Sequence, residues 1–307
     1  MFRIIILTIL VAVCTMTLDP EKLIGQQLPQ SEYEFTPLNC MLYSLSIGFN
    51  EDPHDMRDMR FTYEKNPDFS VFPPMIGAHE IGKIGEIESL PGFHVPHRSN
   101  ILHAESTTEI FKPIKVGQKF AVNMKVIDVA DKKIGAIMCL QTDYVGEDGS
   151  IHATCINSCF LKDCGGFKYR GKMSRLVPNV KKDQANDVII AKTLKNQALL
   201  FRLVGDDNPL HVDPEQSKAI GLDNPVLHGM CTYGVIMRAL YQKYFNGNAD
   251  LIKNTGIRFT SFVYPGETLE IHTYNLTSDG VQFEAKVQER DIVVAVGLIK
   301  MKMTAKL

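Results

Sequence analysis

Two stretches of this 307-residue chain follow one plan, and they lie about half the chain apart. In residues 111–144 and again in 260–289, a turn with a glycine (Gly117 or Gly266) precedes two alternating apolar and polar segments joined by a polar turn. Strict alternation indicates strands with one buried face. A third strand-like segment follows each copy, "IHATCINSCFLK" and "DIVVAVGLIKMK". The repeat therefore predicts two similar α+β halves, each built mainly on an antiparallel sheet.

The composition excludes some classes of partner and cofactor. Apolar residues make up 45% of the chain, and the net charge is only -2 with interspersed signs, so there is no basic stripe for nucleic acid. Seven cysteines occur without a C-x-x-C pair. Cys155, Cys159 and Cys164 cluster, but their spacing departs from paired zinc ligands and their segment has the pattern of a strand. We favour reduced, mostly buried thiols over a metal.

A long buried helix is expected in the second half. After "NPVLHG", apolar residues recur at helical spacing, namely Met230, Tyr233, Ile236, Met237, Leu240 and Tyr244. Such a helix, followed by an antiparallel sheet, can be wrapped by that sheet. A shorter helix is expected to open at Asp213 as N-cap, with Pro214 in its first position, and to stop at Gly221.

The segment "GDDNPLH", residues 205–211, brings unusual polarity to the end of the apolar stretch "LFRLV". Asn208-Pro209 makes the turn rigid, because proline fixes its own φ and restricts the residue before it. Asp206 and His211 can then converge on one water, where a carboxylate orients and tunes an imidazole for acid–base work. The alternative is a structural loop, in which Asp206 caps backbone amides and His211 only satisfies a hydrogen bond.

The stretch "ALLFRLVGDDNPLHVDPEQSKAIGLDNPVLHGMCTYG" resembles the signature of the hydratase 2 family, the MaoC-like (R)-specific enoyl-CoA hydratases. The likeness continues through "IRFTSFVYPGETL", "FTYEKNPDFSVFP" and "ILHAESTTEIFKPI", so it covers the chain from about residue 20 to residue 300. It is similar to the hydratase 2 units of peroxisomal multifunctional enzymes. The resemblance implies a double hot-dog fold, in which two antiparallel sheets each wrap round a helix in one chain.

The resemblance and the repeat together divide the chain. Residues 1–150 contain no second "GDxNPLH", so the first half is expected to be degenerate and the second catalytic. The expected parts are an apolar extension (1–17), the first half (18–166), a crossover linker (167–190), the catalytic half (191–304) and a targeting tripeptide (305–307).

The family assigns roles to residues of the second half. It implies that Asp206 and His211 hold and activate the water, and that Asn208 helps to position them. Gly229, at the start of the long helix, is expected to offer its backbone N–H to the thioester oxygen, where a helix N-terminus meets the developing negative charge. The remaining positions expected to bind substrate are Asp207, Pro209, Leu210, His103, Ala104, Lys132 and Phe259.

Two first-half positions that the family places near the substrate are Glu64 and Ala104. Glu64 matches an acidic residue that the family places near the active site, where it helps in proton transfer or in orienting a loop; the alternative is a surface carboxylate. Ala104 stands where the family commonly has glycine, and its methyl group is expected to crowd a backbone contact to the ligand.

Neither a metal nor a separate cofactor is expected. His94, His97 and His103 suggest a metal site, but Pro96 breaks their spacing and the family uses no metal. His228, just before Gly229, is expected to be structural rather than catalytic. Coenzyme A enters only as part of the substrate.

The implied reaction is reversible hydration of a trans-2-enoyl-CoA to the (3R)-3-hydroxyacyl-CoA, as in peroxisomal fatty acid β-oxidation. Two other functions stay open: a hot-dog acyl-CoA thioesterase, which would release free coenzyme A, and a non-catalytic module that binds acyl-CoA or lipid. The intact pair of Asp206 and His211 argues against both.

The two ends of the chain favour different compartments. Residues 1–17 resemble the apolar region of a signal peptide and are too short for a stable membrane span. The last residues, Ala305-Lys306-Leu307, are a close variant of the S-K-L peroxisomal signal. We expect a peroxisomal protein that meets the peroxisomal import receptor, and a homodimer is compatible with the sequence.

Overall fold

The structure is a computed structural model that describes residues 18–79, 86–95, 100–173, 175–180, 184–219, 221–277 and 279–302. The expected extension 1–17 and the targeting tripeptide 305–307 lie outside this range. Within it, every helix is too short or too polar to cross a lipid bilayer.

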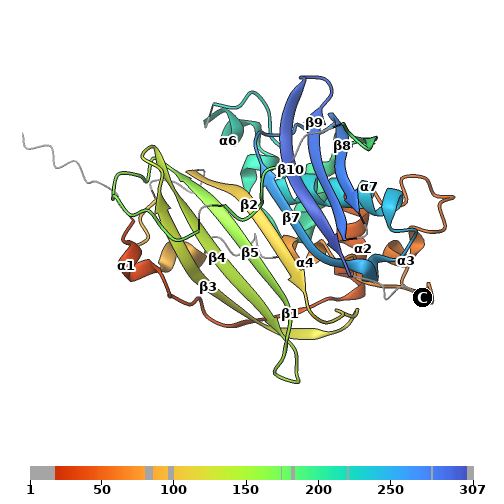
Figure 1. Ribbon diagram of the computed structural model, residues 1–307, viewed down its shortest axis with the longest axis horizontal. Helices are drawn as coiled ribbons and strands as arrows, with labels where there is room; N and C mark the ends of the chain where they lie inside the picture. The colour runs from red at the N-terminus through yellow and green to blue at the C-terminus, as the bar shows by residue number, and fades with distance from the viewer. Residues whose placement is uncertain are drawn as a thin grey trace, which may run out of the picture.

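An antiparallel sheet of ten strands forms the centre of the molecule (Figure 1). The strands of the first half are β1 (Ser31–Glu34), β2 (Ile101–Ile110), β3 (Lys119–Asp131), β4 (Gly135–Val145) and β5 (Ile151–Lys162). Those of the second half are β6 (Asp187–Lys192), β7 (Ile252–Phe259), β8 (Thr268–Thr277), β9 (Gly280–Val287) and β10 (Ile292–Met301). Their spatial order is β1-β3-β4-β5-β2-β7-β10-β9-β8-β6, which confirms the strands that the repeat predicts.

The two halves share one sheet because β2 pairs with β7. The register runs from Glu105 opposite Arg258 to Glu109 opposite Asn254. An unpaired edge strand exposes a row of N–H and C=O groups, and joining two edges satisfies both rows at once. The double hot-dog fold is therefore confirmed, with the two sheets fused along this seam.

The helices pack either on the sheet or on one another. Their bounds are α1 (Pro20–Leu23), α2 (Pro37–Ser46), α3 (Met59–Thr62), α4 (Met75–Ala78), α5 (Gln197–Phe201), α6 (Pro214–Ala219) and α7 (Gly229–Tyr244). The long helix expected from the apolar stripe is α7, in which every residue from Met230 to Tyr241 is buried. The shorter helix expected after Asp213 is α6, where the Asp213 side chain accepts a hydrogen bond from the Glu215 amide at 2.9 Å.

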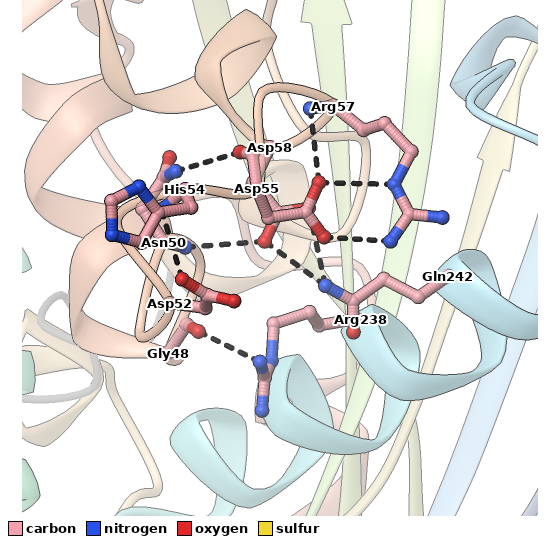
Figure 2. Close-up of polar contacts among 9 residues, drawn as sticks. All are labelled: Gly48, Asn50, Asp52, His54, Asp55, Arg57, Asp58, Arg238 and Gln242. Atoms are coloured by element: carbon pink, nitrogen blue, oxygen red, sulfur yellow. Dashed lines mark hydrogen bonds and ion pairs between the residues drawn. The ribbon is translucent and has the colours of Figure 1, made fainter.

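The first half supplies much of the cover of α7. Tyr241 makes edge contacts with Phe61 and Phe72, with ring centroids 5.4 and 5.5 Å apart. Figure 2 shows how the loop 48–58 contacts the same end of the helix: Arg238 donates to the Gly48 carbonyl at 2.7 Å, and Gln242 donates to Asp58 at 3.0 Å. The loop and α3 therefore lie at the C-terminal end of α7.

The crossover between the halves runs across the face of the first-half sheet opposite the helices (Figure 1) and is held by carboxylates of that sheet. Three side chains each accept two backbone N–H groups of this segment: Asp131 from Gly166 and Lys168, Asp128 from Lys172 and Met173, and Glu105 from Leu176 and Val177. Strand β6 begins at Asp187, inside the expected linker 167–190, so the last residues of that stretch belong to the second half's sheet. Pairing with β8 explains this difference, since an edge strand needs no strong apolar pattern.

All six cysteines that the structure describes are buried and free. Cys155 and Cys159 lie within β5, as the strand pattern predicts. Burial raises the pKa of the Cys159 thiol to about 12, so it stays an unreactive thiol.

Candidate active site

A cavity of about 440 Å³ opens beside the seam between the halves. The first half lines it with Ile101, Leu102, His103, Ala104 and Phe160. The second half lines it from three places: the motif loop (205–211), residues 226–232 at the start of α7, and residues 259–263 after β7. Residues of both halves therefore line this space.

Local rules shape the motif loop. Gly205 has φ +127°, a conformation that other residues rarely adopt, and it ends the short helix Arg202–Val204. The Asn208 side chain then accepts a hydrogen bond from the Leu210 amide at 3.1 Å and caps the single turn Pro209–His211. Asp206 accepts from the Asn208 amide at 3.3 Å. The loop is thus a rigid turn that fixes both ends of the catalytic segment.

His211 presents one defined nitrogen to the cavity. Its Nδ1 lies 2.8 Å from the Val226 carbonyl, which can only accept, so Nδ1 carries the proton and Nε2 is the basic nitrogen. Burial lowers the pKa of His211, while the nearby Asp206 carboxylate opposes that shift. A neutral imidazole with a free Nε2 lone pair can accept a proton from water.

Asp206 lies next to this imidazole. The ligand atoms of Asp206, His211 and His228 are all within 4.8 Å of one another. A single water can bridge two groups at that separation, because each hydrogen bond spans about 2.8 Å. The convergence that the sequence predicts for Asp206 and His211 is present in the structure.

The first turn of α7 faces the same cavity. Gly229 is the first residue of the helix, where backbone N–H groups have no partner within the helix and the helix dipole is positive. A Cβ at this position would lie 3.3 Å from the Phe259 ring, tighter than ordinary packing. Glycine therefore lets the Phe259 ring approach the backbone closely on the cavity wall.

A β-bulge places two first-half residues in the cavity. The pairing of β2 with β5 shifts between His103 and Glu105, so Ala104 has no partner across the pair. Bulges redirect side chains in this way near functional sites. His103 donates from Nε2 to the Glu105 carbonyl at 3.2 Å, and burial lowers its pKa to about 4. Its ring lies 5.3 Å from that of Phe259.

The structure brings most of the expected site residues together. Those lining the cavity are Asp206, Asn208, Leu210, His211, Gly229, His103, Ala104 and Phe259. Asp207 and Pro209 are exposed in the same loop and are not part of the lining. Lys132 is exposed in the turn between β3 and β4. It is not among the residues that line the cavity.

Glu64 is not brought to the catalytic pair. It is exposed in the turn after α3, and α3 follows Asp58, which binds Gln242 in the last turn of α7. A helix of 16 residues spans about 24 Å, and Gly229 is at its other end. The structure therefore favours a surface carboxylate for Glu64. The resemblance fixes the residue type at this position, but not the long-range packing that decides its distance from the site.

Some residues that line the cavity were not predicted from the sequence. Thr232 on α7, Thr260 and Ser261 after β7, and Phe160 on β5 all face the cavity. The helical period could have indicated Thr232, which lies one turn after Gly229, whereas the others depend on strand pairing.

Asp206, His211 and His228 are also close enough together to suggest a metal site. The imidazoles of His211 and His228 are stacked, with centroids 3.8 Å apart and planes at 29°. A metal ion binds in the plane of an imidazole, and a single ion cannot lie in the planes of two stacked rings. One nitrogen of each ring is already held by a backbone carbonyl. The absence of a metal stays a prediction, and this geometry supports it.

Comparisons with known proteins agree with the fold and the motif. The MaoC like domain matches residues 177–297, and the MFE-2 hydratase 2 N-terminal domain matches residues 33–162. An enoyl-CoA hydratase of Mycobacterium tuberculosis is 32% identical over 89% of this chain and 93% of its own. The peroxisomal enoyl-CoA hydratase 2 of Arabidopsis thaliana is 31% identical over 92% of this chain and 96% of its own.

Solved structures give the same picture. A MaoC-like dehydratase from Phytophthora capsici superposes with a TM-score of 0.79 at 30% identity, covering 93% of this chain and 99% of that one. Full-length peroxisomal multifunctional enzyme type 2 from Drosophila melanogaster superposes with a TM-score of 0.75 at 26% identity, covering 90% of this chain and 48% of that one. On its sequence, its double hot-dog fold and its relatives, the chain belongs to the MaoC-like hydratase 2 family.

Proposed function

We propose that this chain is a hydro-lyase, an (R)-specific 2-enoyl-CoA hydratase that converts a trans-2-enoyl-CoA reversibly to the (3R)-3-hydroxyacyl-CoA. The observation that carries this proposal is a single cavity lined by Asp206, by His211 and by the first residue of α7. Its relatives from Mycobacterium tuberculosis and Arabidopsis thaliana, named as enoyl-CoA hydratases, support the same reaction.

The geometry suggests how the reaction proceeds. A water held between Asp206 and His211 loses a proton to this pair as its oxygen bonds to C3 of the substrate. The electron pair of the double bond moves toward the thioester oxygen, where the backbone N–H at Gly229 stabilises the negative charge. Asp206 and His211 then return the proton to C2, so the water has been added in full and the charge is balanced. No redox step occurs, and coenzyme A is the only cofactor-like group, as part of the substrate.

The wider setting is proposed on the same basis. The peroxisomal relative from Arabidopsis thaliana and the terminal Ala305-Lys306-Leu307 support a place in peroxisomal fatty acid β-oxidation and recognition by the import receptor. A homodimer would be compatible with this role. A fluorescent fusion that leaves Leu307 free should collect in peroxisomes and disperse when the last three residues are deleted.

A second candidate, a hot-dog thioesterase, has limited support. An acyl-ACP thioesterase from Bacteroides thetaiotaomicron shares the fold at a TM-score of 0.55 but only 11% identity. The test is to incubate the protein with crotonyl-CoA and with trans-2-decenoyl-CoA, following loss of the conjugated double bond and release of free thiol separately. Hydration without thiol release supports the hydratase, and thiol release without hydration supports the thioesterase. Binding without either reaction would indicate an acyl-CoA-binding module.

A further inference from the structure

His228 occupies a position where a helix cap is expected, but it does not act as one. It is the N-cap residue of α7, and its side chain makes no capping hydrogen bond to the helix. Ser, Thr, Asp or Asn would normally be favoured there, because their oxygen accepts from the first amides. The imidazole instead turns away from the helix toward the motif loop, so the first amides of α7 are left to face the cavity.

The His228 side chain contacts both members of the catalytic pair. Its Nε2 lies 3.2 Å from the Asp206 backbone carbonyl, which can only accept, so Nε2 carries the proton and donates. Its ring face stacks on His211 at a centroid distance of 3.8 Å. The Phe201 ring also packs against it, with ring centroids 5.0 Å apart. One imidazole therefore touches the backbone of one catalytic residue and the ring of the other.

This arrangement has an energetic cost that simple packing would avoid. His228 is only 1% exposed, and its Nδ1 has no hydrogen-bond partner among the described residues. An unsatisfied buried nitrogen is unfavourable, and such exceptions call for an explanation. An aromatic hydrocarbon side chain would fill the same space without that cost, but it could not donate to the Asp206 carbonyl.

We propose that His228 is the positioning residue of this site, holding Asp206 through its N–H donor and His211 through its ring face. The inference rests on the proposed hydratase function, because it concerns the same reaction. The hydrogen bond fixes the backbone where the motif loop leaves Gly205, and the stack fixes the plane of the His211 ring. With Nδ1 held by the Val226 carbonyl, that plane directs His211 Nε2 toward the water.

The charge state of His228 is compatible with this role. Burial, His211 and Arg202 lower its pKa to about 2, with the hydrogen bond to the Asp206 carbonyl opposing the shift. The ring stays neutral while His211 gains and loses a proton. A neutral aromatic face next to a transient imidazolium is favourable, whereas a second cation there would oppose protonation of His211.

Two substitutions separate the two contacts. His228→Phe keeps a flat ring for the stack and removes the donor, while His228→Gln keeps an N–H donor of similar reach and removes the ring. We expect each to lower kcat for crotonyl-CoA by about tenfold or more with KM nearly unchanged, because misplaced catalytic groups affect the chemical step more than binding. His54→Gln, at an exposed histidine of the loop 48–58, is the matched control and should match the wild type.

The second readout does not depend on activity. The titration of the His211 ring, followed by NMR, should shift in both His228 variants and not in His54→Gln. A purely structural residue would change the melting temperature but neither the His211 titration nor the ratio of kcat to KM.

One result would overturn the proposal. The wild type is active, and His228→Phe and His228→Gln both fold, keep a normal kcat and leave the His211 titration unchanged. If either variant fails to fold, the wild-type protein decides the matter. The His228 ring must then show a protonated Nε2 that does not titrate between about pH 5 and pH 8, and a titrating ring would contradict the proposal. An inactive wild type with an intact, variant-sensitive His211 titration would refute the hydratase function and leave the positioning role standing.

Discussion

His211 has two functions that different substitutions can separate: Nε2 serves the reaction, and Nδ1 donates to the buried Val226 carbonyl. His211→Ala removes both nitrogens. Loss of a positioned base lowers kcat by about 10²–10⁴-fold, which at about 1.4 kcal/mol per decade is roughly 3–5 kcal/mol of transition-state stabilisation. The same change leaves the Val226 oxygen without its donor at 2.8 Å, and an unsatisfied buried acceptor costs about 1–3 kcal/mol of unfolding free energy.

Comparison of His211→Ala with His211→Asn separates the roles of the two nitrogens. The Asn side-chain amide nitrogen lies close to where Nδ1 was, so it can still donate to Val226, but no group replaces Nε2. We therefore expect both variants to be inactive and only His211→Ala to lose stability. Steady-state hydration of crotonyl-CoA measures the first effect, urea denaturation measures the second, and the exposed His54→Ala is the control. Near-normal turnover by His211→Asn would refute the role of Nε2, and equal stability of the two variants would refute the role assigned to the Val226 hydrogen bond.

Asp206→Asn should keep the fold and lower kcat by about 10²-fold or more, because the amide cannot accept a proton; circular dichroism and crotonyl-CoA kinetics check this, and normal turnover would contradict it. Gly229→Ala places a methyl group 3.3 Å from the Phe259 ring, so either the ring or the helix start must move, and a displacement of that kind should lower kcat/KM by roughly tenfold to 100-fold in the same assay. Burial lowers the pKa of His103 to about 4 and that of His228 to about 2, so the unfolded chain binds more protons below about pH 6.5. The unfolding free energy, followed by urea denaturation, should therefore fall as pH drops from about 6.5 to about 4, by roughly 1.4 kcal/mol per pH unit for each extra proton; a flat profile would contradict the buried neutral state.

Local patterns predicted the parts of the fold that depend on neighbours in the chain. Alternation located β3, β4 and β5 in the first half and β8, β9 and β10 in the second, since a period of two depends only on one buried face. The stripe from Met230 to Tyr244 located α7, and Asp213-Pro214 located the start of α6. The rigid turn of the motif loop was predicted from Asn208-Pro209, because proline limits its own backbone and that of the residue before it.

Those patterns do not predict which segments far apart in the sequence lie next to one another in the fold. Alternation gives the face of a strand and not its partner, so the pairing of β2 with β7 was not foreseen. The bulge at Ala104 also depends on strand pairing, in this case of β2 with β5. Glu64 shows the same limit for the site: its residue type matched the family, but the packing of α3 at the far end of α7 decides where it lies. His228 was assigned to structure because a motif does not show what a side chain contacts.

The cavity beside the fused seam is proposed to hydrate a 2-enoyl thioester. The most direct measurement combines purified full-length protein with trans-2-decenoyl-CoA and analyses the product on a chiral column, with free thiol assayed in parallel. We expect the (3R)-3-hydroxyacyl-CoA, no thiol release, and loss of the product signal in Asp206→Asn. Formation of the (3S) product, or thiol release in place of hydration, would contradict it.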